Sequence, residues 1–396
     1  MCGGAETRRG ILSLVAAFLF CCLLPAAELN DGVDRSDPNF VKASLLVMGP
    51  GGELFSCIGH ACLRLECPTF KLDNCFSYES ERIGDRIWTF FKGGLKMGMF
   101  AIPTAEFLEE YRASGRGVTQ YALNLPPSVK QQLWRLLDEE VARGADLPYD
   151  YIARGCAQSV LRVLLSALRN VDLKGIRWPE KYRNSRREIV VDVVDAPWTL
   201  FALQSIVGTD WDRAVPNLEK VVVPQDLLVF LQNVNLNGVP LAAQTGTVLL
   251  PTRRAPRPTG LTAFFSPVCV AILVLLFSIV NLFVRRPWLD RAFLALQALL
   301  GAFFTYLVVL SRLPGTTLNW LLVPFNLLPV VFWKWRRLWA LPFVGVLLVW
   351  DAVMAFQPNR YTDVAYVVAV LAYLLFYLKF TTLPGLVRAQ RSSHDA

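Results

Sequence analysis

Histidine is scarce in this chain, and the position of one histidine points to a candidate reaction centre. The sequence holds two histidines, of which His394 is close to the C-terminus and His60 lies in Gly59-His60-Ala61, well upstream of Cys156. Cys156 opens an apolar stretch with helical spacing, and a helix N-terminus favours a thiolate and offers N–H donors to a developing oxyanion. The pair predicts Cys156 as nucleophile and His60 as its base. The alternative is a small buried thiol and a core imidazole.

A base histidine needs its second ring nitrogen held, commonly by a carboxylate. Asp73 is the first candidate, because it lies on a strand that should return beside His60. A turn or surface role is the alternative for Asp73. Asp150, shortly before Cys156, could instead fill the third role or cap the helix that Cys156 begins.

Four further cysteines surround the histidine: Cys57, Cys62, Cys67 and Cys75. Their spacing matches no paired C-x-x-C zinc site, and an exported domain usually joins even numbers of cysteines in bridges. The sequence therefore favours two disulfides over a metal site, and it leaves the pairing open. We expect no metal and no cofactor.

Strands and helices that could position these residues alternate along the first part of the chain. Strands are expected at 43–48, 54–66, 72–78 and 118–125, and helices at 87–91, 104–112, 128–143 and 156–168. A tight turn at Gly49-Pro50-Gly51-Gly52 and short connections favour an antiparallel sheet. The pattern predicts an α+β domain.

The N-terminal residues have the order of a secretory signal. Arg8 and Arg9 precede an apolar run from Ile11 to Leu24, and Pro25-Ala26-Ala27 follows it. We expect residues 1–27 to be a signal peptide, with an uncleaved anchor as the alternative. Residues 28–250 would then form an exported domain, and residues 251–262 a linker to the rest.

The C-terminal part predicts a membrane domain, residues 263–384, with a cytoplasmic tail at 385–396. Five apolar stretches, at 263–284, 291–310, 318–333, 338–356 and 364–380, approach the ~20 residues that a bilayer requires. The third is the weakest, because it is short and holds Pro324 and Pro329. Asn319 and Asn326 in this region need polar partners, either as packing contacts or in a headgroup pocket.

The distribution of cations agrees with the positive-inside rule. The segments that would be cytoplasmic carry Arg285, Arg286, Arg291, Lys334, Arg336, Arg337, Lys379, Arg388 and Arg391, against Arg312 and Arg360 outside. The net charge of +8 reflects this bias and lipid contact, since no nucleic-acid module with interleaved aromatics is present in the sequence. The expected location is the bacterial inner membrane, with the catalytic domain periplasmic.

Several short motifs, taken in order, resemble the bacterial Lnb-type lipoprotein N-acyltransferase family. They are Gly49-Pro50-Gly51-Gly52-Glu53, Gly59-His60-Ala61-x-x-Arg64, Asp73 before Tyr78, Tyr111-x-x-x-Gly115-Arg116, Leu123-Asn124-Leu125, Tyr149-Asp150-Tyr151 ahead of Cys156, Val223-Pro224-x-Asp226-Leu227 and the Asn319 to Pro329 stretch. The resemblance covers most of the mature chain. It implies a circularly permuted papain-like thiol domain, in which His60 is the base and Cys156 the nucleophile. Arg154-Gly155 departs from the family's Asp-Asn before the cysteine, which affects the local turn and the oxyanion geometry.

The function expected from these features is a membrane-bound cysteine acyltransferase. By resemblance, its donor is a phospholipid and its acceptor is the N-terminal amine of a diacylated lipoprotein, with an acyl thioester on Cys156 between them. An exported cysteine amidase or peptidase acting on cell-wall peptide is the alternative, although it would need no set of spans. A non-enzymatic sensor is a third reading, and the short C-terminal tail carries no output module for it.

Overall fold

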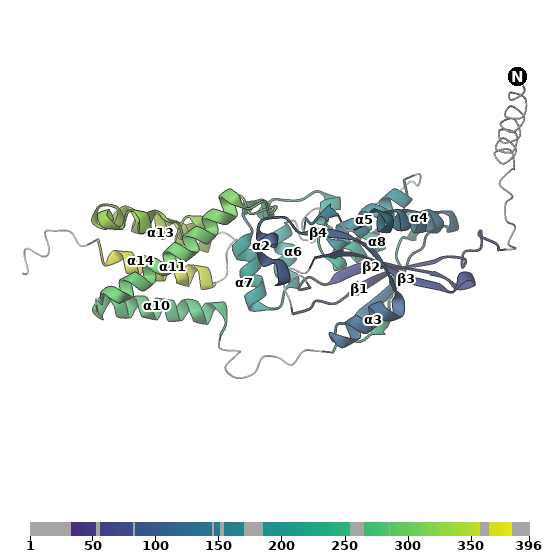
Figure 1. Ribbon diagram of the computed structural model, residues 1–396, viewed down its shortest axis with the longest axis horizontal. Coiled ribbons are helices and arrows are strands. Elements are labelled where there is room, and N and C mark those ends of the chain that lie inside the picture. The colour runs from purple at the N-terminus through teal and green to yellow at the C-terminus, as the bar shows by residue number, and fades with distance from the viewer. Residues whose placement is uncertain are drawn as a thin grey trace, which may run out of the picture.

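The computed structural model describes residues 33–52, 56–81, 84–144, 146–150, 154–169, 185–253, 265–284, 286–356 and 364–381. Within them the chain forms an α+β domain and, at the opposite end of the molecule, a bundle of long helices (Figure 1). The expected signal peptide at 1–27 and tail at 385–396 lie outside the described residues, as does most of the linker at 251–262.

A seven-stranded sheet in the order β6-β4-β3-β2-β1-β5-β9 is the frame of the first domain, and all neighbouring strands are antiparallel. The strands are β1 (Lys42–Met48), β2 (His60–Cys67), β3 (Leu72–Ser80), β4 (Lys96–Pro103), β5 (Val118–Ala122), β6 (Leu147–Pro148) and β9 (Thr247–Leu250), with β7 (Asn235–Leu236) and β8 (Val239–Pro240) as a separate pair. The α+β prediction is confirmed. The strand expected at 54–66 begins only at His60, because residues 56–59 form a turn.

Helices cover both faces of this sheet (Figure 1). Helices α4 (Pro127–Arg143), α5 (Cys156–Ala167) and α8 (Pro224–Asn233) bury apolar side chains against one face, in the main core with Leu45, Leu63 and Phe76. Helix α3 (Thr104–Ala113) packs on the other face through Phe107 and Tyr111. The helices expected at 104–112, 128–143 and 156–168 are thereby confirmed.

Three short helices lie between the sheet and the bundle (Figure 1). They are α2 (Ile87–Phe91), α6 (Arg186–Val193) and α7 (Pro197–Ile206). Phe90 of α2 and Ile206 of α7 belong to the same buried cluster as Phe304 and Leu313 of the membrane part. The two parts are also joined by a hydrogen bond from the Gly208 N–H to the Gly315 oxygen, at 2.7 Å.

The bundle contains α10 (Pro267–Val284), α11 (Pro287–Thr305, extended by a π turn at Tyr306–Leu310), α13 (Arg336–Ala355) and α14 (Val364–Leu378). Among the described residues, three helices are long and apolar enough to cross a membrane: Pro267–Val284, Pro287–Leu310 and Trp333–Ala355. The described part of α14 is shorter. Of the roughly five membrane helices that the sequence predicts, the described residues show three at full length.

The stretch expected as a third span, 318–333, is not one helix. It holds only a 3-10 turn at Trp320–Leu322, α12 (Leu328–Val331) and the start of a 3-10 turn at Trp333–Trp335. Pro324 and Pro329 have no N–H to continue a helix. The segment nevertheless runs the length of the bundle, because Gly315 contacts the first domain while Trp333 stacks on Phe376 near the end of α14.

Polar side chains satisfy the backbone that this broken segment exposes. The Gln297 amide of α11 donates to the Pro324 and Asn326 oxygens, at 3.1 and 2.7 Å. Asn319 donates to the Ser205 oxygen at 2.7 Å, and its own oxygen accepts the Leu321 N–H. Irregular backbone at membrane depth is tolerated where it is buried in protein and paired in this way. Asn319 is thus a packing contact that ties this segment to α7.

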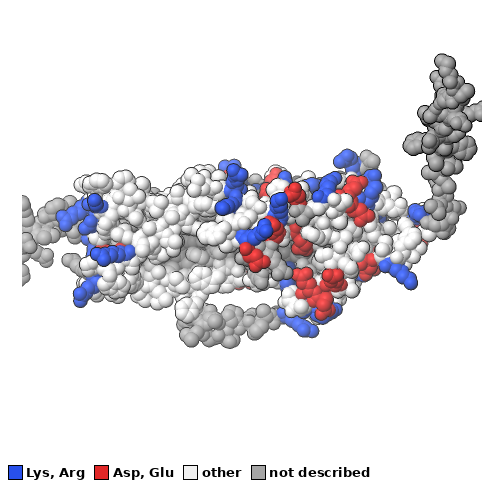
Figure 2. Space-filling view, in the orientation of Figure 1, with Lys and Arg blue, Asp and Glu red and all other residues white. Residues whose placement is uncertain are grey.

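Basic side chains gather at the free end of the bundle, and a broad uncharged band separates them from the charged first domain (Figure 2). At this end Lys379 pairs with Asp290 at 2.7 Å, and the Arg336 guanidinium lies over the Trp333 ring at 4.9 Å. This is the arrangement that the positive-inside rule predicts for a cytoplasmic end.

Candidate active site

His60 is the first residue of β2, and a turn that requires glycine positions it. Gly59 has φ +85, and a Cβ there would lie 2.7 Å from the Met48 oxygen. Pro224, the first residue of α8, borders the same glycine. Asp226 fixes the start of α8, because its fully buried carboxylate accepts the Val222 and Val223 N–H groups at 3.1 and 3.0 Å. The turn and α8 together hold the imidazole at the end of the strand.

Cys156 is the first residue of α5, and the fold brings it to His60. Its thiol lies close enough to the His60 side chain and the Ala61 backbone N–H for both to lower its pKa. Gly155 is the N-cap and provides no side-chain cap, so the first-turn N–H groups of α5 stay open beside the sulfur. The sheet therefore supplies the imidazole, and the opposite layer supplies the thiol.

The two groups shift each other's pKa in opposite directions. Burial raises the pKa of the Cys156 thiol, but the charge of His60 and the hydrogen bonds from His60 and Ala61 outweigh it, and the net pKa is lowered. Burial lowers the pKa of His60, but the negative charges of Cys156 and Glu79 and the hydrogen bond to Cys156 outweigh it, and the net pKa is raised. These directions favour a thiolate and imidazolium pair, which is the reactive form of a cysteine nucleophile.

Glu79 and Ser77 of β3 hold the other side of the imidazole. His60 Nε2 lies 2.7 Å from Ser77 Oγ and 3.3 Å from Glu79 Oε1, and Ser77 Oγ donates to Glu79 Oε1 at 2.5 Å. With Nε2 occupied, the second ring nitrogen is left for the sulfur. Burial would raise the pKa of Glu79, but His60, Ser77 and Arg116 lower it, so this carboxylate stays ionised. Glu79 and Ser77 were not identified from the sequence.

The structure does not bring Asp73 to His60, which corrects the choice of orienting carboxylate. Asp73 pairs with Glu66 in the β2–β3 ladder, about 20 Å along the strand from His60 at ~3.3 Å per residue. Its carboxylate instead accepts two hydrogen bonds from Arg64, at 2.8 and 2.7 Å, and one from Thr104 Oγ1 at 2.5 Å. Desolvation raises the pKa of Asp73, but these hydrogen bonds lower it by more, so its net pKa is lowered.

Asp150 and Arg154, on the amino-terminal side of Cys156, are joined through their backbones. The Asp150 oxygen accepts the Arg154 N–H at 2.8 Å, and the cap position of α5 belongs to Gly155. Arg154, at a departure from the family pattern, donates to the Pro148 oxygen at 3.2 Å. Its own oxygen accepts a hydrogen bond from Ser159 Oγ at 3.3 Å. Arg154 is thus bonded both to Pro148 and to Ser159 of α5.

Tyr149 connects the thiol to the membrane part. Burial raises its pKa first, and the nearby Cys156 charge raises it further. Its N–H donates to the Leu95 oxygen at 2.7 Å, and its side chain packs against both the main core and the cluster that holds Ile206 and Phe304. The sequence indicates Tyr149 only as part of a motif.

The expected disulfides are not seen among the described residues, where Cys62, Cys67 and Cys75 are thiols. Cys62 and Cys75 lie diagonally on β2 and β3 and share a hydrogen bond, while Cys75 Sγ lies 3.5 Å from Thr104 Oγ1. Cys57 packs instead in a separate cluster with Trp211. Among the described residues, no group of three or more His, Cys, Asp or Glu could hold a metal ion.

This fold and site define a class: an α+β domain with a paired cysteine and histidine, attached to apolar helices. Residues 31–188 match the family model of the Lnb N-terminal periplasmic domain. Residues 31–188 therefore carry an Lnb-type N-terminal periplasmic domain. Neither the curated proteins nor the solved structures compared with the chain gave a match.

Proposed function

We propose that the protein is a membrane-bound cysteine acyltransferase. In this proposal a fatty acyl chain moves from a phospholipid to Cys156 and then to the N-terminal amine of a diacylated lipoprotein. The observation that carries the proposal is the contact of Cys156 with His60 in a periplasmic domain packed directly on apolar helices. A thiol held next to the membrane in this way is well placed to react with an ester at the depth of the lipid headgroups.

In the first half-reaction the Cys156 thiolate attacks the ester carbonyl. A C–S bond forms, the first-turn N–H groups of α5 face the developing oxyanion, and the ester C–O bond breaks. The His60 imidazolium gives its proton to the leaving oxygen, so a lysophospholipid departs. Glu79 and Ser77 keep the ring oriented during this transfer.

In the second half-reaction the lipoprotein amine attacks the thioester carbonyl. A C–N bond forms, the C–S bond breaks, and His60 takes the proton that the amine loses. The thiolate is regenerated beside an imidazolium. Ping-pong kinetics follow, because the first product leaves before the acceptor reacts.

The test uses the full-length protein in detergent micelles with a phospholipid carrying a labelled acyl chain. We expect a hydroxylamine-sensitive label on Cys156, and its transfer to an added diacylated lipopeptide. Cys269→Ala is the matched control, since Cys269 is a free cysteine in the bundle and should not be needed. Label that persists in Cys156→Ala, or cleavage of cell-wall peptides without any labelled protein, would overturn the proposal.

A further inference from the structure

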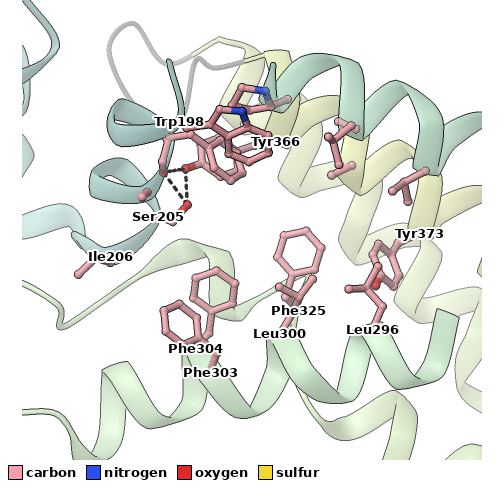
Figure 3. A pocket seen from close by; sticks show the side chains of 18 of the residues that line it. Trp198, Ser205, Ile206, Leu296, Leu300, Phe303, Phe304, Phe325, Tyr366 and Tyr373 are labelled. Atoms are coloured by element: carbon pink, nitrogen blue, oxygen red, sulfur yellow. Dashed lines mark hydrogen bonds between the residues drawn. The ribbon is translucent and has the colours of Figure 1, made fainter. Parts of the chain in front are cut away.

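A cavity of about 440 Å³ lies where the periplasmic domain meets the bundle (Figure 3). Helix α7 of the first domain closes one side, and α10, α11 and α14 close the others. Its volume lies within the range of about 300–1,000 Å³ that is typical of ligand pockets.

The walls of the cavity are apolar and aromatic. Leu300, Phe303 and Phe304 of α11 line one wall, opposite Trp198 and Tyr366 (Figure 3). None of the described residues that line it is charged. The hydroxyls of Ser205 and Tyr366 lie 2.7 Å apart, and both donate to the Phe201 oxygen, so they are already satisfied. Such walls suit an occupant with no polar groups.

The position of the cavity suits a molecule that enters from the membrane. It borders the first residues of α10 and α14, at the end of the bundle nearest the periplasmic domain. Trp198 is half exposed there, and its indole N–H donates to the Phe265 oxygen. Tryptophan with its polar atom at this level is typical of the membrane–water interface. In that setting lipid acyl chains are the abundant apolar molecules.

Tyr149 links the cavity to the thiol. Its side chain packs against the cluster of Ile206 and Phe304, and both of these residues line the cavity. On its other side, Tyr149 is close enough to Cys156 to sense the charge of the sulfur. Tyr149 is therefore in contact with the cluster that forms the cavity wall and is also near the sulfur.

We propose that this cavity holds the acyl chain of the phospholipid donor while its carbonyl reacts at Cys156, so that the cavity sets which chain lengths are transferred. This inference rests on the proposed acyltransferase function. The physical reason is packing. Each methylene of the acyl chain that enters the apolar cavity gains packing contacts, until the cavity is full.

The test shortens the cavity by Val270→Trp and Ala369→Trp in the full-length protein. Val346→Trp is the matched control, because Val346 lines a different apolar cavity, between α12 and α13. Each folded variant receives an equimolar mixture of short-chain and long-chain phospholipids, and the acyl groups on Cys156 are counted by mass spectrometry. One methylene in an apolar pocket is worth about 10–200-fold in selectivity. We expect the long-to-short ratio to fall by about tenfold or more in the two cavity variants and to stay unchanged in the control.

A thioester that forms with an unchanged ratio in both cavity variants would overturn the cavity inference and leave the acyltransferase proposal standing. A second arm needs no turnover: Cys156→Ser protein is irradiated with a phospholipid that carries a photoreactive group at the chain end. Cross-links on the cavity walls of α7, α10, α11 or α14 support the inference even if no thioester ever forms. Cross-links confined to other surfaces overturn it, as do cavity cross-links obtained only from a diacylated lipopeptide carrying the same group.

Discussion

The thiol site and the apolar cavity are held together in different ways. At the site, strand register and hydrogen bonds give each polar group its partner, as in the chain from His60 through Ser77 to Glu79. At the cavity, the phenylalanine rings are held by packing alone, as where Phe304 stacks on Phe325 at 5.9 Å. Hydrogen bonds fix position to a fraction of an ångström, whereas apolar packing tolerates substitution if volume is kept. Changes at the site should therefore alter rates by orders of magnitude, and changes in the bundle should act on stability by smaller amounts.

The largest effect is expected from His60→Ala. Loss of the base should slow thioester formation by about 10²–10⁴-fold and raise the pKa of Cys156, whose thiolate His60 stabilises. In the unchanged protein the rate should rise with pH through the lowered pKa of Cys156, as the thiolate forms. It should fall again through the raised pKa of His60, as the proton for the leaving oxygen is lost.

The measurement is the pH profile of thioester formation, together with alkylation of Cys156 by a small neutral reagent. His394→Ala, at the other histidine of the sequence, is the control. An unshifted alkylation profile in His60→Ala would show that the sulfur is not ionised by this imidazole.

The next effect separates two carboxylates on β3. Glu79→Gln should slow thioester formation on the order of 10²-fold, less than the ~10⁴-fold that removal of a triad carboxylate can cost, because the Glu79 side chain is 44% exposed. Asp73→Asn should leave the rate and its pH profile unchanged. It should cost about 1 kcal/mol of stability or less, since its pair with Arg64 is partly exposed. Equal rate losses in the two variants would remove Glu79 from its orienting position.

A smaller effect tests the contact between the two regions. A Cβ at Gly208 would lie 1.9 Å from the Thr317 oxygen, so Gly208→Ala should lower the free energy of unfolding by about 1–3 kcal/mol. Gly345→Ala is the control, because no atom lies within 4 Å of a Cβ there. Thermal unfolding of the full-length protein in detergent measures both. If the two variants unfold alike, the periplasmic domain and the broken segment are not packed as described.

The smallest effect is expected at Gln297, inside the bundle. Gln297→Leu would remove the amide from the Pro324 and Asn326 oxygens. Side-chain hydrogen bonds inside membrane bundles contribute about 0.6 kcal/mol on average and about 1.7 kcal/mol at most. We expect a loss in this range by detergent unfolding, and none for Leu299→Ala at an exposed position of the same helix. A stability equal to that of the unchanged protein would show that the broken segment does not depend on Gln297.

The sequence predicted the elements of the site better than it predicted their partners. Apolar periodicity placed α5 and β3 correctly, because one buried face dictates the spacing. The prediction of Asp73 as the carboxylate that orients His60 was wrong, although strand register could have indicated Glu79. A turn at 68–71 pairs Cys67 with Leu72, and counting along both strands then sets His60 opposite Glu79.

Other features depend on contacts that no local pattern contains. The third apolar stretch has the composition of a span, but Pro324 and Pro329 break it, and it persists because Gln297 and α7 supply partners from distant parts of the chain. The cavity likewise forms only when α7 meets α10, α11 and α14. The spacing of the cysteines likewise does not show that Cys57 packs in a different cluster from Cys62 and Cys75.

The hydrogen bonds between the α7 region and the broken segment fix the position of Cys156 relative to the bundle. The Gly208 N–H donates to the Gly315 oxygen, and the Asn319 amide donates to the Ser205 oxygen. These hydrogen bonds fix the thiol domain directly on the bundle. In the proposed function, a sulfur fixed at this level would react with esters and amines that diffuse within the membrane plane, and not with those dissolved in the periplasm.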